Sequence, residues 1–408
     1  MSSRIEHDVL GKKKVPSDVL YGIHTQRAKE NFNISGTTLP LELFHAIAEI
    51  KIAAAQANAQ LGLLDKKKAT VIIRAAKEIL QGAHDGEFVV DAFQAGEGTP
   101  THMNVNEVIA NRSLELLRKR KGQYHIIHPN DDVNMGQSTN NVVPTAIKIV
   151  TWRKLNCLLN VVDTLEKELL QKSKAFHAII KAGRTHLQDA VPMTLGQEFH
   201  AYATAMKENK RRIKNVMPVL LEINVGMNAI GTGVNTHKRF SPLVMKNLKK
   251  MQKIKWKHAQ DPIYATQNVT VFLEVSEMVK LLAMDVNKMA NDFRLLSSGP
   301  KTGLGEITLP AVEPGSSIMP GKVNPSMAEM VNMVCYQVFG NNEAISAAEQ
   351  AGQLELNVML PLIGKCVIES VDILAKSLDV FTKRCVKGIK ANPEMCRWFV
   401  EYSAGMAT

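Results

Sequence analysis

A short polar loop holds the residues of this chain that are best suited to chemistry. Residues 315–325 have the sequence GSSIMPGKVNP, in which glycines and prolines separate two serines, a lysine and an asparagine, so the segment cannot be helical throughout. Its backbone N–H groups and the cation of Lys322 can hold an anion, and a serine hydroxyl near that cation can lose its proton. Taken alone, such a composition is more often a surface turn.

The elements that position this loop are predicted to be long helices. Segments 145–182, 263–298 and 365–387 contain neither proline nor glycine, and their apolar residues recur at spacings of three and four. Such a stripe must bury against other helices, and its excess length predicts contacts between subunits. Residues 1–140 show shorter periodic segments broken by glycine and proline, which favours a smaller N-terminal helical domain.

Bulk composition excludes several classes of protein. Aromatic residues make up 5% of the chain and methionine occurs 19 times, which favours packed helices over a β-sandwich. No segment approaches the roughly 20 apolar residues that span a bilayer, and residues 1–14 are too polar for a signal peptide. The five cysteines lack C-x-x-C spacing, so we expect reduced thiols without a zinc site, no membrane association and a cytoplasmic location.

The net charge of +11 raises the question of nucleic-acid binding, to which the lysine runs at 12–14 and 66–68 add weight. Aromatic residues do not alternate with these lysines, and no nucleic-acid-binding module is recognisable. We therefore expect solvated lysines and no nucleic-acid partner. A positive field also speeds the capture of a small dianion.

Four segments together identify a family resemblance. They are 94–111 (QAGEGTPTHMNVNEVIAN), 128–146 (HPNDDVNMGQSTNNVVPTA), 183–199 (GRTHLQDAVPMTLGQEF) and the loop 315–325. These segments resemble the aspartase/fumarase superfamily, whose GSSxMPxKxN signature the loop matches at every fixed position. The resemblance extends over essentially the whole chain.

The resemblance implies an all-α fold and a homotetramer in which three subunits contribute to each active site. It divides the chain into an N-terminal helical domain over 1–140, a central long-helix bundle over 141–392, and the start of a truncated C-terminal domain over 393–408. The implied reaction is reversible β-elimination from a small dicarboxylate. No cofactor is required, although Mg²⁺ or another divalent cation activates some relatives.

Catalytic roles also follow from the resemblance. Ser316 corresponds to the base, with Ser317 as the less favoured alternative, and neighbouring N–H groups and Lys322 would stabilise its alkoxide. His186 lies near the leaving group, and Glu329 corresponds to a glutamate that orients this histidine. Considered alone, His186 is more often a structural histidine.

The remaining candidate positions correspond to substrate contacts. Lys322 and Asn324 would grip the carboxylate that does not become the aci-acid. The other carboxylate, which bears the developing charge, would be held by Thr99, Ser138 and Thr139. Asn140 and Thr185 correspond to positions around the leaving group.

The leaving group is ammonia or water. Thr139 in QSTN, together with the segments 188–199 and 351–359, resembles aspartases, whereas 103–111 and 128–134 resemble class II fumarases equally well. The balance predicts elimination of ammonia from L-aspartate. The alternatives are hydration of fumarate to malate, or a structural assembly that has lost turnover.

Several residues differ from the family pattern, and they are predicted to weaken turnover. Glu97 adds a negative charge near the carboxylate site, where it would repel a dicarboxylate unless it faces away or is paired. Residues 401–408 align with the point where relatives enter a small C-terminal domain, which we expect this chain to lack. The other departures are Pro100, His102, Gly136, Asn141 and Leu360.

Overall fold

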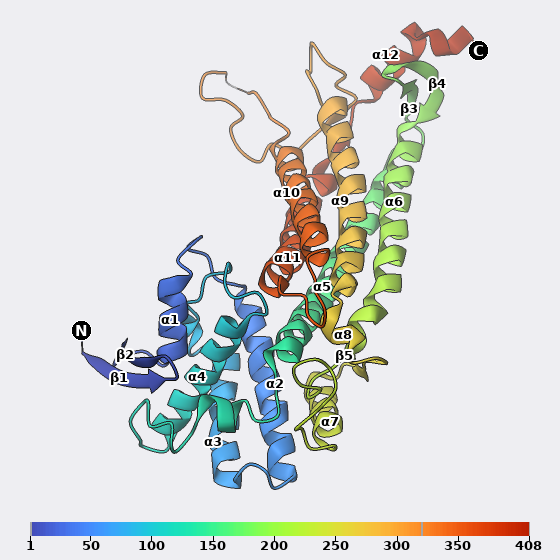
Figure 1. Ribbon diagram of the computed structural model, residues 1–408. Coiled ribbons are helices and arrows are strands. Elements are labelled where there is room, and N and C mark those ends of the chain that lie inside the picture. The colour runs from blue at the N-terminus through green and yellow to red at the C-terminus, as the bar shows by residue number, and fades with distance from the viewer. Residues whose placement is uncertain (1, 320, 408) are drawn as a thin grey trace. The chain divides into compact units, whose positions relative to one another are not determined.

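The computed structural model describes residues 2–319 and 321–407. Pro320 of the loop 315–325 lies outside the described residues, as do Met1 and Thr408 at the ends of the predicted domains. Helices account for most of the described part of the chain (Figure 1). The prediction of an all-α fold is confirmed.

The helices and strands have the following bounds. The α-helices are α1 (Ile23–Asn31), α2 (Leu41–Gln60), α3 (Lys66–Leu80), α4 (Thr99–Leu116), α5 (Thr139–Ala175), α6 (Leu195–Val216), α7 (Phe240–Gln252), α8 (Tyr264–Gln267), α9 (Thr270–Leu296), α10 (Ser326–Glu349), α11 (Leu360–Arg384) and α12 (Pro393–Tyr402). Single helical turns are η1 (Asp85–Glu87), η2 (Pro129–Val133), η3 (Met217–Leu221), η4 (Val386–Gly388) and η5 (Ala404–Ala407). Antiparallel strand pairs are β1–β2 (Ser3–Asp8, Gly11–Pro16), β3–β4 (Ile180–Thr185, Gln188–Thr194) and β7–β8 (Ile307–Thr308, Lys390–Ala391). The parallel pair is β5–β6 (Glu222–Ile223, Lys257–His258).

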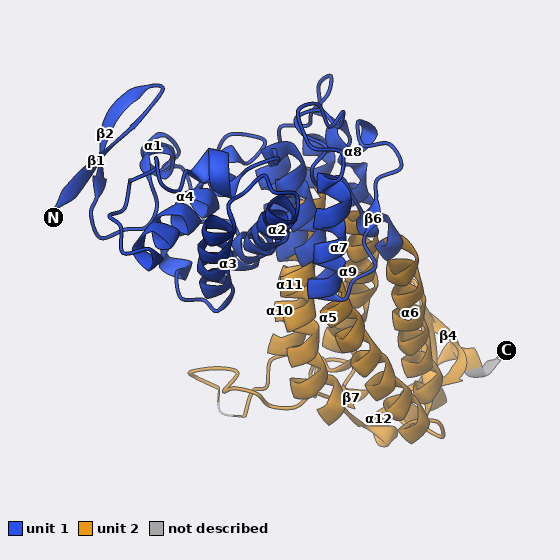
Figure 2. Cartoon of the chain, turned by 90° about the horizontal axis from the view of Figure 1, so that it is seen from below, with its two compact units in different colours: residues 1–153, 217–274, 344–369 blue, residues 154–216, 275–343, 370–408 orange. Residues whose placement is uncertain are grey.

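The chain divides into two compact units, coloured separately in Figure 2. Unit 1 comprises residues 1–153, 217–274 and 344–369, and unit 2 comprises residues 154–216, 275–343 and 370–408. Each unit is therefore built from separated stretches of sequence. The domain boundaries expected from the sequence stay a prediction.

The long helices expected from apolar periodicity are present. Helix α9 buries its whole predicted stripe, which comprises Phe272, Val275, Val279, Leu282, Val286, Met289, Phe293 and Leu296. Helix α11 is also found, and it begins before the predicted segment, at Leu360. Helix α5 begins at Thr139 and includes Pro144, but it ends at Ala175. The end of the segment 145–182 is strand, because Ile180–Thr185 pairs with β4.

Aromatic rings join three helices in the core of unit 2. The Phe293 ring of α9 stacks on Phe199 of α6 at 5.5 Å and on Phe381 of α11 at 5.9 Å between centroids. Stacked pairs of this kind stabilise a core beyond the burial of their area. They fix α9, which precedes the segment containing the loop 315–325, and α6, which follows the β3–β4 hairpin.

In unit 1, the buried carboxylate of Glu107 on α4 anchors the start of α1. It accepts hydrogen bonds from the backbone N–H groups of Gly22, His24 and Thr25, and from the Thr25 hydroxyl. Burial raises the pKa of Glu107 to about 7, while these donors oppose the shift. The contact places His24 beside the polar residues of α4.

Phe44 of α2 tests the core of unit 1. Its buried ring stacks on Phe88 at 4.5 Å, so Phe44→Ala should lower the free energy of unfolding by about 3–5 kcal/mol. Leu41 lies on the same helix with 39% of its surface exposed, so Leu41→Ala should cost less than about 1 kcal/mol. Urea unfolding followed by circular dichroism measures both, and equal losses would contradict this packing.

Candidate functional site

The loop 315–325 closes on itself through a neck formed by Gly315, Lys322 and Asn324. The Gly315 N–H donates to the Lys322 carbonyl oxygen at 3.0 Å, and Asn324 Nδ2 donates to the Gly315 carbonyl oxygen at 2.7 Å. A Cβ atom at Gly315 would lie 2.2 Å from the Lys322 carbonyl oxygen. Only glycine fits this position with the neck intact.

Inside the loop, two backbone donors converge on the Ser316 hydroxyl. The N–H groups of Ile318 and Met319 each donate to Ser316 Oγ at 3.2 Å. Two donors at one oxygen stabilise negative charge on it. Among the described residues, Ser317 receives no such bonds and is exposed, so the geometry distinguishes Ser316 from its neighbour.

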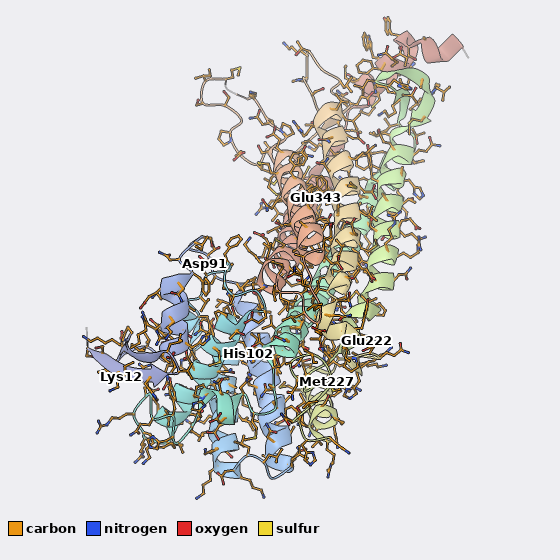
Figure 3. All side chains as sticks on the ribbon, in the orientation of Figure 1. Lys12, Asp91, His102, Glu222, Met227 and Glu343 are labelled. Atoms are coloured by element: carbon orange, nitrogen blue, oxygen red, sulfur yellow. The ribbon has the colours of Figure 1, made fainter. Side chains whose placement is uncertain are left out.

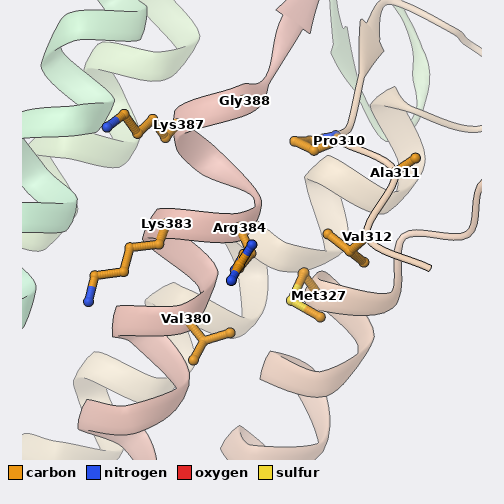
Figure 4. Close-up of a pocket in the computed structure, with 9 residues that line it drawn as sticks. All are labelled: Pro310, Ala311, Val312, Met327, Val380, Lys383, Arg384, Lys387 and Gly388. Carbon is orange, nitrogen blue, oxygen red and sulfur yellow. The ribbon is translucent and has the colours of Figure 1, made fainter.

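Two pockets adjoin the loop within unit 2. The first has a volume of about 460 Å³, and its lining includes Ala311, Val312, Pro314, Ser316 and Lys322. The second, of about 670 Å³, shares Ala311 and Val312 and is also lined by Lys383, Arg384 and Lys387 of the α11 end and the turn after it (Figure 4). In Figure 4, Arg384 lies nearer Val312 and Met327 than the two lysines do. These cations make the surroundings of the loop attractive to an anion.

The second group of candidates lies in unit 1, where α4 and α5 begin. Thr99 Oγ1 donates to Thr139 Oγ1 at 3.2 Å, and His102 Nδ1 lies 2.8 Å from the same oxygen. On its other side, His102 Nε2 lies 2.5 Å from Lys51 Nζ of α2. The predicted contacts Thr99 and Thr139 are thus brought together, and His102, labelled in Figure 3, joins them to a buried lysine.

Ser138 and Asn140 flank Thr139, and both form hydrogen bonds with backbone groups of this chain. Ser138 Oγ accepts from the Asn140 N–H at 3.2 Å and so caps the N-terminus of α5. Asn140 Nδ2 donates to the Ala229 carbonyl oxygen at 2.7 Å. Asn141 Nδ2 likewise donates to the Asn228 carbonyl oxygen at 2.7 Å. These bonds hold the start of α5 against the segment 228–229.

Thr185 and His186 lie at the tip of the β3–β4 hairpin. Thr185 pairs with Gln188, which leaves His186 and Leu187 as the two turn residues, with φ of 56° and 58°. A turn with both central residues at positive φ suits the twist of a hairpin but normally uses asparagine and glycine, so two ordinary side chains here are strained. Both are exposed.

A buried ionic cluster holds this hairpin in place. Lys181 Nζ lies 2.7 Å from Glu198 and 2.8 Å from Glu306, and Arg184 lies 2.8 Å from Glu306. The carboxylates of Glu198 and Glu306 raise the pKa of Lys181 against the opposing effect of burial. The Arg184 guanidinium also lies 4.9 Å from the centroid of the Phe399 ring. Strand β3 is therefore tied to its own unit, and the turn is held out to solvent.

The structure does not join His186 to its predicted partner. Glu329 is exposed in the first turn of α10, and no hydrogen bond or ion pair connects it to His186 among the described residues. The role of Glu329 therefore stays a prediction. The other candidates also lie apart in sequence and unit: Thr99, Ser138, Thr139 and Asn140 in unit 1, and Thr185, His186, Ser316, Ser317, Lys322 and Asn324 in unit 2.

Most departures from the family pattern have structural roles. Gly136 has φ of +73°, and a Cβ there would lie 3.2 Å from the Phe240 ring. Pro100 stands in the first turn of α4, where no N–H bond is lost. Leu360 is buried, and its N–H donates to the Gly96 carbonyl oxygen at 3.1 Å. Glu97 lies near His24; burial lowers the pKa of His24, and the carboxylates of Asp8 and Glu97 partly oppose that shift.

Residues 2–319 and 321–407 contain no group of three or more His, Cys, Asp or Glu side chains that could hold a metal ion. In the same residues, no helix is both long and apolar enough to cross a membrane. The five cysteines are free, and four of them are buried.

The sequence did not reveal the residues that contact and orient the candidate site residues. Lys51 was visible as a lone cation in an apolar stretch of α2, but its contact with His102 spans α2 and α4. Asn134 and Gln137, which also contact Lys51, lie in the segment 128–146 but were not among the predicted site residues. The N–H groups of Ile318 and Met319 depend only on backbone geometry.

Comparison with known proteins places these features in a family context. Residues 11–340 match the protein family described as Lyase. The aspartate ammonia-lyase of a Bacillus species is 47% identical over 405 residues, which cover 99% of this chain and 86% of that protein. The solved structure of fumarate lyase:delta crystallin from Brucella melitensis bound to cobalt has a TM-score of 0.97 at 44% identity, covering 100% of this chain and 89% of that one. Class II fumarase from Schistosoma mansoni has a TM-score of 0.95 at 37% identity, covering 99% and 88%.

The neck of the loop 315–325 makes a testable feature. Gly315→Ala forces the new Cβ against the Lys322 carbonyl oxygen, so the neck should open and trypsin should cleave after Lys322 several-fold faster. Gly340→Ala is the matched control, because nothing lies within 4 Å of a Cβ at that helical position. Equal cleavage rates in both variants would show that the neck does not restrain the loop.

Proposed function

The chain belongs to this lyase family, and we propose that it is an aspartate ammonia-lyase that eliminates ammonia from L-aspartate to give fumarate. The observation that carries the proposal is 47% identity to an aspartate ammonia-lyase over 99% of the chain. The prediction of superfamily and of reaction made from the four segments agrees with this relative and with the lyase match.

Ser316 is the proposed base. It removes a proton from C3 of aspartate, next to a carboxylate, and leaves an aci-carboxylate dianion; the C2–N bond then breaks and ammonia departs. The N–H groups of Ile318 and Met319 support this role, because they stabilise charge on Ser316 Oγ. Lys322 and Asn324 of the same loop hold the carboxylate that does not take part.

The aci-carboxylate is assigned to Thr99, Ser138 and Thr139. Their hydroxyls lie at the starts of α4 and α5, where backbone N–H groups also favour an anion. Charge accumulates on this carboxylate during proton removal, so donors aimed at it lower the barrier more than they strengthen ground-state binding. Asn140, Thr185 and His186 are assigned to the leaving ammonia, with Ser317 as a further substrate contact.

We propose that the protein is a homotetramer and that its active sites take residues from several subunits. Apolar side chains on the bundle helices support association, since Met333, Tyr336 and Met284 are 64%, 53% and 47% exposed. Ile318 and Met319 of the loop are also exposed apolar side chains that another subunit could bury. In such an assembly, His186 of one subunit and Glu329 of another can form the predicted pair.

The proposed chemistry uses hydrogen-bond donors and a serine base, so no cofactor is required. A divalent cation such as Mg²⁺ is proposed as an activator only, and the described residues offer it no cluster of three or more acidic, histidine or cysteine ligands. The proposed partners are the dicarboxylate and further copies of the chain. A cytoplasmic location is proposed because the cysteines are free.

Fumarate hydratase activity is the alternative, supported by the TM-score of 0.95 with a class II fumarase. The lower identity to that protein, 37%, makes it second. A third possibility, a family member that assembles without turnover, depends on the departures at Glu97, His102 and Asn141. The local contacts of Asn141 and Glu97 weaken that case.

Substrate choice is tested with L-aspartate and L-malate, supplied separately to the purified protein. Formation of fumarate, followed by ultraviolet absorbance, is expected with aspartate at a kcat/KM at least about 100-fold above that with malate, because an ammonium pocket rejects a neutral hydroxyl. Preference for malate would establish the hydratase. If a folded tetramer formed no product from either substrate, the non-catalytic assembly would be the remaining explanation.

The base is tested by Ser316→Ala. Loss of a general base should lower kcat by about 10²–10⁴-fold with the tetramer intact, as checked by light scattering. Ser317→Ala is the matched comparison and should cost less. If Ser317→Ala caused the larger loss, the base assignment would move to that residue.

A further inference from the structure

Within the described residues, a buried lysine of unit 1 has no carboxylate as a hydrogen-bond or ion-pair partner. Lys51 of α2 has no exposed surface, and its Nζ lies 2.5 Å from His102 Nε2, 2.7 Å from Asn134 Oδ1 and 3.0 Å from Gln137 Oε1. An ammonium group has three donors and no acceptor, so these three acceptors satisfy it completely. The contacts therefore fit a charged Lys51.

A charged Lys51 fixes the direction of every hydrogen bond beyond it. Because His102 Nε2 accepts from the ammonium, the neutral ring carries its proton on Nδ1 and donates it to Thr139 Oγ1 at 2.8 Å. Thr99 Oγ1 donates to the same oxygen at 3.2 Å. A hydroxyl accepts two bonds and donates one, so the Thr139 O–H has only an outside acceptor left.

We propose that Lys51 and His102 are positioning residues that hold Thr139 as a hydrogen-bond donor to the substrate carboxylate. The inference rests on the proposed function, in which Thr139 contacts the carboxylate that becomes the aci-acid. Neither Lys51 nor His102 touches the substrate. Each bond in the chain from Lys51 through His102 to Thr139 is polarised by the one behind it, so the buried cation strengthens the last donor.

The chain also has a reversed state. A neutral Lys51 amine accepts through its lone pair, so His102 Nε2–H donates to it, and His102 Nδ1 then accepts the Thr139 hydroxyl proton. Loss of one proton from Lys51 to solvent therefore turns the Thr139 donor away from the substrate. Burial holds the pKa of Lys51 well below its ordinary value, so the reversed state forms at a lower pH than it would for an exposed lysine.

The charged groups facing the chain favour a neutral His102. Burial lowers the pKa of His102 well below its ordinary value, and Lys51 of α2 and His24 of α1 lower it further. Glu97, before α4, acts on His24. An imidazolium at His102 would place two positive charges in contact, so Lys51 is the group whose titration reverses the chain.

A pair of variants separates the two ends of His102. In His102→Asn, the amide nitrogen stands near the place of Nδ1 and keeps a donor for Thr139. In His102→Gln, the longer amide reaches the place of Nε2 and keeps the contact with Lys51 while Thr139 loses its donor. We expect His102→Asn, which keeps the donor but loses the bond to Lys51, to lower kcat for aspartate by about three- to fivefold, and His102→Gln to lower kcat by about 10–100-fold with a smaller change in KM.

Measuring His102→Gln in a Thr139→Val background distinguishes a role of His102 in positioning Thr139 from a role in packing. If His102 acts through the Thr139 hydroxyl, His102→Gln should lower kcat less than about twofold further in that background. Thermal unfolding of each variant monitors the fold. An undiminished effect of His102→Gln in the Thr139→Val background, or equal losses in His102→Asn and His102→Gln, would overturn the proposal.

A spectroscopic measurement tests the chain independently of turnover. In protein labelled with ¹⁵N-histidine, solid-state NMR should show a neutral His102 protonated on Nδ1 at neutral pH, and on Nε2 at alkaline pH. The resonance is assigned by its loss in His102→Asn. A proton on Nε2 at neutral pH would overturn the positioning role even in an active enzyme, whereas absence of turnover with a proton on Nδ1 would overturn the proposed function alone.

Discussion

In the described part of unit 1, the ammonium group of Lys51 is buried with no carboxylate partner, and α2, α4 and the segment before α5 all depend on this constraint. Moving an ammonium out of water costs several kcal/mol unless other dipoles replace its hydration. Lys51 receives that replacement from two amide oxygens and an imidazole nitrogen. These contacts tie α2 to α4 and to the segment before α5.

Each unit supplies hydrogen-bond donors to the proposed reaction. In unit 1 the charged group, Lys51, does not contact the substrate itself but lies behind the donor Thr139. Donors aimed at the aci-acid oxygens stabilise the charge that develops during proton removal more than they stabilise the carboxylate of bound aspartate. The two N–H groups on Ser316 follow the same principle on the side of the base. The arrangement suits a reaction whose difficult step creates negative charge on a carbon next to a carboxylate that is already charged.

The fold was predictable because the apolar stripes of α9 and α11 specify which face of each helix is buried, and the buried residues follow those stripes. The loop 315–325 was predictable because its residue order is distinctive. The features of the site that could not be predicted arise from contacts between segments distant in sequence, or from backbone geometry. The link between Lys51 and His102 joins separate helices, the donors to Ser316 are backbone N–H groups, and the left-handed turn at His186 and Leu187 contains neither of the residues that normally mark such a turn. The stretch 180–182 was expected to be helical because a helix and a short strand share the same apolar run, and only pairing with β4 decides between them.

The neck of the loop 315–325 has an entropic consequence. Ordering a free segment costs about 1–2 kcal/mol for each residue that is fixed, so a fully flexible catalytic loop would consume much of the binding energy of a small substrate. Gly315, Lys322 and Asn324 have already fixed the two ends of this loop against each other. The neck therefore leaves a smaller part of the ordering cost to be met when a substrate binds.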